Sequence, residues 1–430
     1  MIQVAIIGGG AAGCFAAVNI KKLRPDVDVT VYESGRRPLA KVAITGGGRC
    51  NLTNSFADVL SLESIYPRGS RLMKRLLKVF SHVDTMKWFE DNGVRLVTQP
   101  DHCVFPASQD AMEIVGTLTS GMRRAGVNVL TGHRVAEIVS ESGGASGYTL
   151  KFIDDALPDV HADKVLVTTG GSPRRSGLSM LDGLGLDIID PVPSLFSFNI
   201  GMMEKASGSI SSSRDEALSS LMGTVVSNAV IGLVGTRFRA SGPLLITDWG
   251  MSGPAILKLS SYAARFLAEN QYRASLSVNW LGEMNVNEVV SMLSSMALSS
   301  PQKQLASLYP DRFNSRLWAF LIGRAGLPST KRWAELGQKG MNRLADTLTC
   351  DIYPVVGRNR FKGEFVTCGG VALTCIDPNT LECRRRPGLY FAGEVMDVDA
   401  VTGGFNLQAA WTMGYVAARA ISVAIPPSRL

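Results

Sequence analysis

The chain has 430 residues, of which 46% are hydrophobic and 19% are charged, and it contains 44 glycines. This composition excludes a disordered or fibrous protein and is typical of an α/β enzyme with two or three packed units. Seven cysteines without a CxxC pair indicate free thiols in a reducing cytoplasm. The net charge of +7 comes from small, scattered basic groups. Such scattering favours a solvated surface that attracts anionic ligands, and it disfavours nucleic-acid binding.

Residues 1–20 are apolar enough to mimic a signal peptide, but they lack a basic start, and their glycines are spaced for another purpose. No other stretch reaches the roughly 18 apolar residues that a membrane crossing requires. We therefore expect a cytoplasmic protein that has no membrane partner.

The chain begins with the pattern of a βαβ unit. Residues 2–7 form an apolar run typical of a buried parallel strand, residues 11–23 predict a helix of small residues, and residues 28–33 predict a second strand. The turn between the first strand and the helix carries the sequence Gly8-x-Gly10-x-x-Gly13. A GxGxxG sequence in this setting predicts a dinucleotide site.

Each glycine of this motif has its own physical reason. Gly8 permits the tight turn, Gly10 lets the backbone approach a pyrophosphate, and Gly13 lets the helix pack closely on the sheet. The pyrophosphate would meet free N–H groups at the positive end of the helix. Glu33 lies 20 residues after Gly13, where it would accept hydrogen bonds from a ribose diol. The motif leaves FAD and NAD open, whereas Glu33 argues against NADP because it would repel a 2′-phosphate.

The rest of the chain alternates between α/β and β patterns. Predicted helices cover 70–92 and 110–125, and predicted strands cover 94–98, 127–130, 135–139, 148–152 and 164–169. The pattern is mainly β over 196–278, and helices then follow at 285–298, 312–322 and 331–346. A strand at 388–391 and a helix at 407–424 restore the α/β pattern. The sequence predicts one interrupted domain, 1–190 with 351–430, around an insertion at 191–350, with three consecutive domains as the alternative.

A second motif is the polar, glycine-rich segment that runs from Lys41 to Asn54. Its three consecutive glycines, 46–48, can expose N–H groups as an anion-binding nest, to which Arg49 adds a planar charge. The alternative is a surface loop with a helix cap. We expect Cys50 to be structural or to lie beside a cofactor, because the sequence identifies no His partner that would make it a nucleophile.

A third motif lies near the end of the chain, where the strand at 388–391 runs into Gly393-Glu394. A glycine-rich stretch and a long helix follow. The carboxylate would lie beside a sugar-like chain, and the helix N-terminus would point at negative charge. A reduced flavin carries negative charge around N1 and its C2 carbonyl, so a helix dipole placed there would favour reduction. On chemistry alone, the alternative is a capped core helix.

Together these motifs resemble a bacterial family of FAD-dependent oxidoreductases with aminoacetone oxidase-like and 3-dehydro-bile-acid reductase-like members. The family's signatures match as TGGGRCNLTN at 45–54 and GLYFAGEVMDVDAVTGGFNLQAA at 388–410. Shorter matches lie at 104–108, 168–171, 242–257 and 366–371, so that the resemblance covers essentially the whole chain. It implies an α/β fold: a glutathione reductase-like Rossmann FAD-binding domain, interrupted by a mainly-β, barrel-like domain with helices.

The resemblance also implies which residues hold non-covalent FAD. We expect no metal site, because too few ligands surround the candidate His102. Residues 8–13 would hold the pyrophosphate, Glu33 the adenosine ribose, Val135 the adenine and residues 404–407 the isoalloxazine. The full expected set is Gly8, Gly10, Ala11, Ala12, Gly13, Glu33, Lys41, Thr45, Gly46, Gly47, Gly48, Arg49, Cys50, Asn51, Val135, Thr169, Gly170, Gly393, Glu394, Gly404, Phe405, Asn406 and Leu407.

The chain departs from the family where a substrate could sit. His102-Cys103 replaces the usual Gly-Arg, Pro173-Arg174-Arg175 replaces a longer loop, and Asp248 replaces the usual His. No family member's substrate is therefore carried over. Tyr353 is a candidate proton donor, but its position before Pro354 favours a packing role.

The expected function is hydride transfer between a small organic substrate and bound FAD. Either O2 or NAD(P)H would complete the cycle, although the chain has no second strand–GxGxxG–helix unit for a dedicated NAD(P) site. The alternative is a basic flavoprotein that binds RNA or takes part in tRNA modification.

Overall fold

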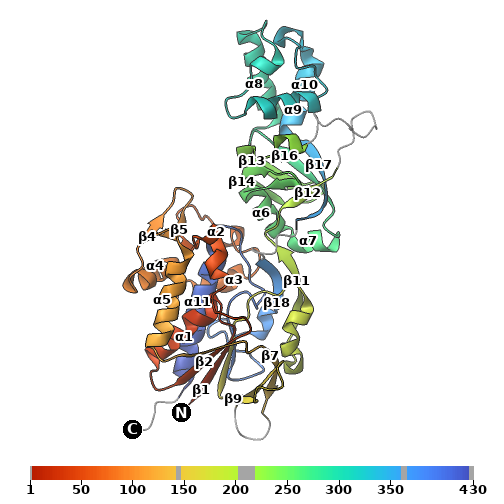
Figure 1. Ribbon diagram of the computed structural model, residues 1–430. Coiled ribbons are helices and arrows are strands. Elements are labelled where there is room, and N and C mark those ends of the chain that lie inside the picture. Colours follow the sequence, from red (N-terminus) through yellow and green to blue (C-terminus); the bar gives the residue numbers. More distant parts are fainter. Residues whose placement is uncertain (1, 142–146, 202–217, 360–365, 426–430) are drawn as a thin grey trace. The chain divides into compact units, whose positions relative to one another are not determined.

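The structure is a computed structural model that describes residues 2–141, 147–201, 218–359 and 366–425. The chain divides into two compact units (Figure 1). The first unit joins Met1–Pro193 to Phe361–Leu430, and the second, the barrel unit, is Ser194–Arg360. The predicted arrangement of a domain interrupted by an insertion is therefore confirmed. Within the described residues, no helix combines the length and apolarity that a membrane crossing requires.

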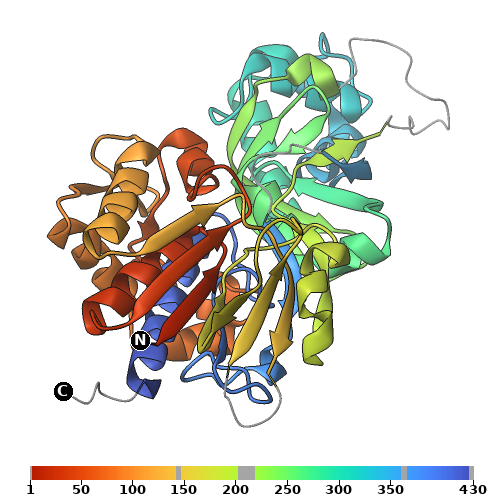
Figure 2. The same cartoon turned by 60° about the horizontal axis from the view of Figure 1, so that its bottom comes forward.

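A five-stranded parallel sheet forms the centre of the first unit. Its order is β19 (Leu389–Phe391), β10 (Lys164–Val167), β1 (Gln3–Ile7), β2 (Asp28–Glu33) and β6 (Asn128–Thr131). In the central strand, Val4 pairs with Lys164 on one side and with Val29 on the other. Residues 4–7 of β1 are buried, as expected for a strand covered on both faces. Segments from the two ends of the chain thus share one sheet, which Figure 2 shows as red and blue elements in one unit.

Three helices lie side by side in this unit: α1 (Ala11–Leu23), α5 (Ala111–Arg124) and α11 (Phe405–Ala424) (Figure 1). Small residues allow close approach on both sides of α1. A Cβ on Gly414 of α11 would lie 2.7 Å from the carbonyl oxygen of Ala12, and one on Gly121 of α5 would lie 3.4 Å from Val18 Cγ2. The N-terminal and C-terminal helices are therefore packed backbone to backbone at Gly414.

The remaining elements of the first unit are short. Small antiparallel sheets combine β3-β5-β4 and β7-β8-β9, and β11 pairs with β18. The bounds are α2 Thr45–Gly48, β3 Thr53–Asn54, α3 Ser70–Leu76, α4 His82–Asp91, β4 Leu96–Thr98, β5 Cys103–Pro106, β7 Val135–Ser140, β8 Tyr148–Phe152, β9 Val160–Ala162, β11 Ile188–Ser194 and β18 Val366–Val371.

The helix predicted over 70–92 is in fact two helices, α3 and α4. The break occurs at Ser81, whose hydroxyl accepts a hydrogen bond from the Asp84 N–H at 3.3 Å. The Asp84 carboxylate in turn accepts from the Ser81 N–H at 2.7 Å. This reciprocal capping box begins a new helix, and an apolar periodicity alone did not reveal it.

The barrel unit is a closed six-stranded barrel with helices α8, α9 and α10 gathered together (Figure 1). Its strands follow one another in the order β12-β15-β14-β13-β16-β17. The bounds are β12 Phe198–Ile200, β13 Val225–Leu233, β14 Arg239–Ile246, β15 Gly250–Ser252, α6 Pro254–Tyr262, α7 Ala264–Glu269, β16 Ala274–Asn279, α8 Val286–Ser299, α9 Ser315–Arg324, α10 Gly337–Thr349 and β17 Asp351–Arg358. One apolar core fills both the barrel and its helices.

Strand β17 corrects the predicted domain boundary at residue 351. It pairs with β16 from Asp351 onwards and with β12, so it closes the barrel and belongs to the insertion. At the other boundary, β11 pairs with β18 of the first unit, which moves the start of the insertion from residue 191 to Ser194.

The predicted mainly-β stretch over 196–278 also contains α6 and α7, and its residues 202–217 lie outside the described part of the chain. The helix predicted from residue 331 begins instead at Gly337.

Candidate dinucleotide site

The turn after β1 is built from glycines that the protein itself requires. Gly8 has a φ of +106°, and a Cβ there would lie 2.6 Å from the carbonyl oxygen of Thr168. A Cβ on Gly13 would lie 2.2 Å from the Gly8 carbonyl oxygen and 2.5 Å from Thr168 Oγ1. The Thr168 hydroxyl donates to the Gly8 carbonyl at 2.8 Å. The tight turn and the close packing of helix on sheet therefore both depend on these two glycines.

Gly10 differs because no contact within the protein requires a glycine there. It is the N-cap of α1 with a φ of −85°, and a Cβ there would have Thr168 O, at 4.0 Å, as its nearest neighbour among the described residues. No described side chain caps this helix. The uncapped N–H groups and positive end of α1 thus face a space that a side chain at residue 10 would fill, which is the arrangement that binds phosphates.

Glu33 ends β2 beside this turn. Its carboxylate accepts hydrogen bonds from the N–H groups of Gly9 at 2.8 Å and Gly35 at 2.5 Å. The side chain therefore stabilises the glycine turn as well as lying where a ribose was predicted. The backbone N–H of His133 donates to the Glu33 carbonyl at 3.0 Å, which brings the start of β7 and the predicted residue Val135 to the same edge of the sheet.

Glu394, which follows β19, lies beside residues from three segments that are far apart in the sequence. Its carboxylate accepts from the Thr367 N–H at 2.6 Å, and the Lys41 ammonium lies 3.7 Å from its second oxygen. A Cβ on Gly170 would lie 3.9 Å from that same oxygen. The Lys41 side chain is 64% exposed, so this ion pair is weak and leaves the cation accessible to an anion.

The predicted residues Lys41, Gly170 and Glu394 are thus brought together, whereas the neighbouring Thr169 side chain is exposed. Gly393 has a φ of +83°, and a Cβ there would lie 3.3 Å from the Cβ of Ala12 in α1.

The glycine-rich segment forms one sharp turn. Gly46, Gly47 and Gly48 have φ values of +57°, +69° and +83°, a region that strains other residues. The turn closes with a hydrogen bond from the Cys50 N–H to the Thr45 carbonyl at 3.0 Å. A Cβ on Gly47 or Gly48 would meet nothing within 4 Å among the described residues, so this face of the turn is open.

Arg49 is exposed and is held beside the turn. Its guanidinium carbon lies 4.5 Å from the centre of the Phe105 ring, and its Nε donates to the Gly46 carbonyl at 3.2 Å. Arg49 therefore stiffens the turn from outside, and the arrangement leaves most of its donors available.

Cys50 and Cys103 are buried behind this turn. Burial raises the pKa of the Cys50 thiol to about 12 and that of the Cys103 thiol to about 11. A buried, protonated thiol is inert, so the structural role expected for Cys50 is favoured over nucleophilic catalysis. Cys103 belongs to the His102-Cys103 departure, and its thiol interacts with Asn51. The His102 Nε2 lies 2.7 Å from a carboxylate oxygen of Asp58.

The second and third motifs meet at the N-terminus of α11. Gly404, with a φ of +87°, is the N-cap of α11. Apart from Asn51, no described side chain accepts a hydrogen bond from the N–H groups at this helix end. The Asn51 side-chain oxygen accepts from the Gly404 N–H at 3.2 Å, and its nitrogen donates to the Thr53 carbonyl at 3.0 Å. A Cβ on Gly404 would lie 2.3 Å from the Thr53 carbonyl oxygen. The two predicted halves of the flavin side are therefore in direct contact.

The remaining predicted residues of α11 differ in role. The Asn406 amide makes two hydrogen bonds of 2.9 Å with the backbone of Ala400, so it shapes the loop before the helix. The Phe405 ring is buried and packs edge-on against Phe56, with the ring centres 5.2 Å apart. Leu407 is half-buried in the same turn.

The two helix N-termini are separated along α11. Ala12, in the first turn of α1, contacts Gly414, which is ten residues after Gly404. At 1.5 Å per residue, the distance along α11 is about 15 Å. An elongated ligand with negative charge at two separated points suits such a pair of positive helix ends.

Two residues from the sequence analysis lie outside this site, in the barrel unit. Tyr353 is fully buried and donates to Asp351 at 2.5 Å, and the Arg324 guanidinium lies over its ring. Burial is the largest cause that raises the pKa of Tyr353 well above its usual value, which supports the packing role. Asp248 also belongs to this unit.

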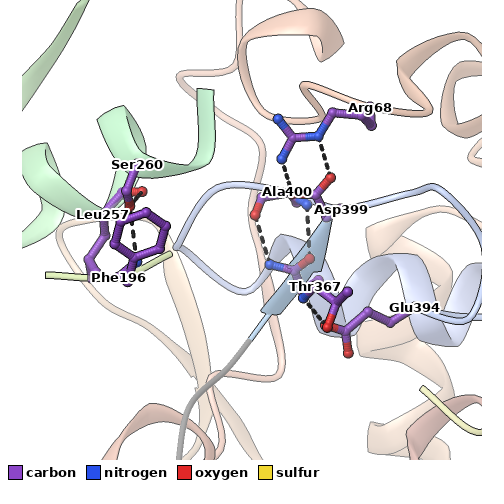
Figure 3. Close-up of polar contacts among 9 residues, drawn as sticks. Arg68, Phe196, Leu257, Ser260, Thr367, Glu394, Asp399 and Ala400 are labelled. Carbon is purple, nitrogen blue, oxygen red and sulfur yellow. Dashed lines mark hydrogen bonds and ion pairs between the residues drawn. The ribbon is translucent and has the colours of Figure 1, made fainter. Parts of the chain in front are cut away.

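Sequence reasoning missed several residues that build the site. Thr168 and Thr367 hold the glycine turn and Glu394, and Gln408 anchors the first turn of α11 to β3. Arg68 forms a buried ion pair with Asp399 just before α11 (Figure 3). Asp399 lies within the signature at 388–410, whereas Arg68 lies in no predicted motif, and nothing in the sequence links two residues so far apart.

The sequence matches the family described as HI0933-like protein Rossmann domain over residues 2–420. The chain belongs to this HI0933-like family. The resemblance drawn from the sequence is confirmed at that level, and the predicted fold class, a Rossmann-type FAD-binding domain with a mainly-β insertion, is confirmed with it.

Curated relatives of this HI0933-like chain carry two different names. A 3-dehydro-bile acid delta(4,6)-reductase of Clostridium scindens is 27% identical over 432 residues, covering 98% of this chain and 99% of the relative. A ribosomal RNA dihydrouridine synthase of Escherichia coli is 27% identical over 420 residues, covering 96% of each chain. That of Haemophilus influenzae is 26% identical over 423 residues, covering 97% of this chain and 98% of the relative.

Proposed function

We propose that this protein is an FAD-dependent oxidoreductase that reduces a carbon–carbon double bond conjugated to a carbonyl group. The observation that carries the cofactor part of the proposal is the pair of glycine-bordered helix N-termini, α1 and α11, within one unit. The open space at Gly10 suits a pyrophosphate, and the contact between Asn51 and Gly404 forms a polar floor for a flavin ring. The exposed Lys41, 3.7 Å from the Glu394 carboxylate, offers a cation to an anionic ligand.

The names of the relatives support a reduction in particular. One name denotes reduction of a dehydro-bile acid, and the other denotes formation of dihydrouridine, in which a uracil ring gains two hydrogens. Both reactions saturate a double bond polarised by a carbonyl. When bound, FAD supplies this chemistry, because its reduced form delivers a hydride to one carbon while a proton reaches the other.

The chain's own residues would bind and orient the cofactor. The N–H groups at the start of α1 hold negative charge at Gly10, and Glu33 accepts hydrogen bonds at the ribose end. The N-terminus of α11 favours negative charge that develops at the flavin end on reduction. Buried Phe405 and Cys50 exclude water from behind the two turns that border this end.

The test begins with an absorption spectrum of the purified protein. Flavin bands near 370 and 450 nm (roughly, as flavins show) support the cofactor, and anaerobic addition of NADH and then NADPH identifies an electron donor by bleaching. The reduced protein is then mixed with a conjugated enone of the steroid type. Reoxidation of the flavin together with gain of two hydrogens by the enone supports the proposal. A protein that cannot be loaded with FAD, or reduced flavin that no conjugated carbonyl compound reoxidises, contradicts it.

The second candidate is that the reduced double bond belongs to a base in RNA. The names of two relatives favour it. The net charge of +7 would also attract RNA, although its basic groups are scattered along the chain. RNA binding driven by phosphate contacts weakens steeply with salt. A salt-sensitive gel shift with ribosomal RNA, followed by nucleoside mass spectrometry for dihydrouridine, would support this candidate. Absence of a shift at low ionic strength would remove it.

A further inference from the structure

A buried ion pair lies in the loop that leads into α11. Two nitrogens of the Arg68 guanidinium donate to the two oxygens of Asp399 (Figure 3). The Asp399 side chain is fully buried, and that of Arg68 is 10% exposed. A two-pronged arginine–carboxylate contact is a strong and geometrically specific one. Burial also means that solvent and salt screen these charges poorly.

The residues around Arg68 hold the same loop. The Val401 N–H donates to the Ile65 carbonyl at 2.9 Å, and the Tyr66 hydroxyl donates to the Phe405 carbonyl at 3.0 Å. The backbones of Arg68 and Asp399 also form an antiparallel bridge. The shape of the loop before α11 therefore does not depend on the ion pair alone.

Asp399 brings a full negative charge close to the positive end of α11. Its neighbour Ala400 is bonded through both backbone groups to the amide of Asn406, in the first turn of that helix. A carboxylate at this position offsets the positive potential of the helix end. The guanidinium of Arg68 in turn neutralises the charge of that carboxylate. Poorly screened charges act over longer distances than exposed ones.

We propose that Arg68 is a positioning residue that tunes the reduction potential of the flavin at the N-terminus of α11, by compensating the charge of Asp399. The inference rests on the proposed function, because it requires FAD at this site. It assigns a role to the ion pair that joins Asp399, inside the signature at 388–410, to Arg68, which no predicted motif includes. The reduced flavin carries more negative charge than the oxidised form, so an uncompensated carboxylate nearby disfavours reduction.

The experiment measures the flavin reduction potential in FAD-loaded protein by anaerobic titration against a reference dye. Arg68→Met removes the positive charge and is expected to lower the ratio of reduced to oxidised flavin at fixed potential about tenfold, which is about 30 mV for a two-electron couple. Asp399→Asn removes the negative charge, leaves Arg68 in place, and is expected to shift the ratio by a similar factor in the opposite direction. Arg68→Lys keeps the charge and is expected to remain near the wild-type value.

The opposite signs distinguish an electrostatic role from a merely structural one. Loss of loop order alone would move both single variants in the same direction. Shifts of like sign, or no shift in flavin-loaded variants, overturn the inference while leaving the proposed function intact. If Arg68→Met does not fold, Asp399→Asn decides alone, because an unchanged potential there overturns the inference. A wild-type protein that binds no flavin overturns the proposed function first, and the inference with it.

Discussion

Gly10 and Gly13 lie in the same turn, yet contacts within the protein require a glycine only at position 13. Gly13 is required by protein contacts as short as 2.2 Å, whereas a Cβ on Gly10 has no neighbour closer than 4.0 Å among the described residues. Gly10→Ala is therefore expected to leave the unfolding temperature of the apo-protein unchanged. It should weaken FAD binding tenfold or more, about 1.4 kcal/mol, because the added methyl occupies the space assigned to the pyrophosphate. Fluorescence titration with FAD measures the affinity.

Gly13→Ala is the matched comparison. Its methyl group must displace backbone, so we expect a destabilisation of about 1–3 kcal/mol even without FAD. Thermal unfolding of both apo-variants separates the two effects. Equal FAD affinity for Gly10→Ala and the wild type would contradict a pyrophosphate at this helix end.

Cys50 provides a test of the buried turn. Because burial raises its pKa to about 12, the reactive thiolate fraction at pH 8 is on the order of 10⁻⁴. Iodoacetamide at pH 8 should therefore modify the exposed Cys350 at least about a hundredfold faster than Cys50. The thiolate fraction of Cys50 rises with pH, so its labelling should increase from pH 8 to pH 10. Peptide mass spectrometry gives both rates, and comparable labelling at pH 8 would indicate an accessible, activated thiol instead.

At the residue scale, the spacing of the glycines predicted the part of the site that depends on backbone geometry. The requirements at Gly8 and Gly13 follow from the GxGxxG pattern alone. The pattern could not show that Asn406 bonds to Ala400, or that Thr168 and Thr367 supply supporting hydrogen bonds. Such contacts join segments far apart in sequence, and no local periodicity encodes them.

At the scale of elements, α11 is anchored by a buried chain of hydrogen bonds. Thr53 Oγ1 donates to Gln408 Oε1 at 2.6 Å, and Gln408 Nε2 donates to Thr412 Oγ1 at 2.9 Å. The Thr412 hydroxyl then donates to the Phe80 carbonyl at 3.0 Å. All three side chains are buried, so each group that loses its partner pays a desolvation cost.

Thr412→Val keeps the shape of this side chain and removes the hydroxyl. We expect a loss of about 1–3 kcal/mol in the free energy of unfolding, because the Gln408 amide and the Phe80 carbonyl lose their partner. Thr412→Ser is the control, since it keeps the hydroxyl and loses one methyl group, worth about 0.8 kcal/mol. Urea unfolding followed by circular dichroism measures both. A larger loss for Ser than for Val would show that packing, and not hydrogen bonding, anchors α11 here.

Long, periodic elements were predicted well, and breaks and caps were not. The first strand was predicted from an unbroken apolar run, the following helix from its small residues after a glycine turn, and α5 from its sequence pattern. The division at Ser81 depends on a capping box, and α6 begins at Pro254 within a stretch rich in Ser and Thr, where local preference favours strands. In both cases, a start signal outweighed the pattern of the surrounding residues.

At the scale of the whole molecule, the interrupted domain was predictable because its motifs lie at the two ends of the chain. The exact residue at which the chain returns from the barrel unit to the first unit could not be predicted. β17 alternates buried and exposed residues, as a strand of either unit could. Its partners, β12 and β16, decide the assignment. Long-range pairing of this kind is a property of the assembled barrel.

The division into two units leads to a last prediction. Every residue expected to bind FAD lies in the first unit, and the barrel unit has its own apolar core. A ligand that binds one folded unit stabilises that unit by mass action.

Adding FAD to the apo-protein should therefore slow amide hydrogen exchange at the starts of α1 and α11 and at residues 45–51, by tenfold or more at saturating FAD. Exchange in β13 and β16 should change less than about twofold. Gly10→Ala serves as the control, because its weaker binding should reduce the protection about tenfold at equal FAD concentration. Mass spectrometry of peptic peptides resolves these segments, and protection centred on the barrel strands would place the cofactor elsewhere.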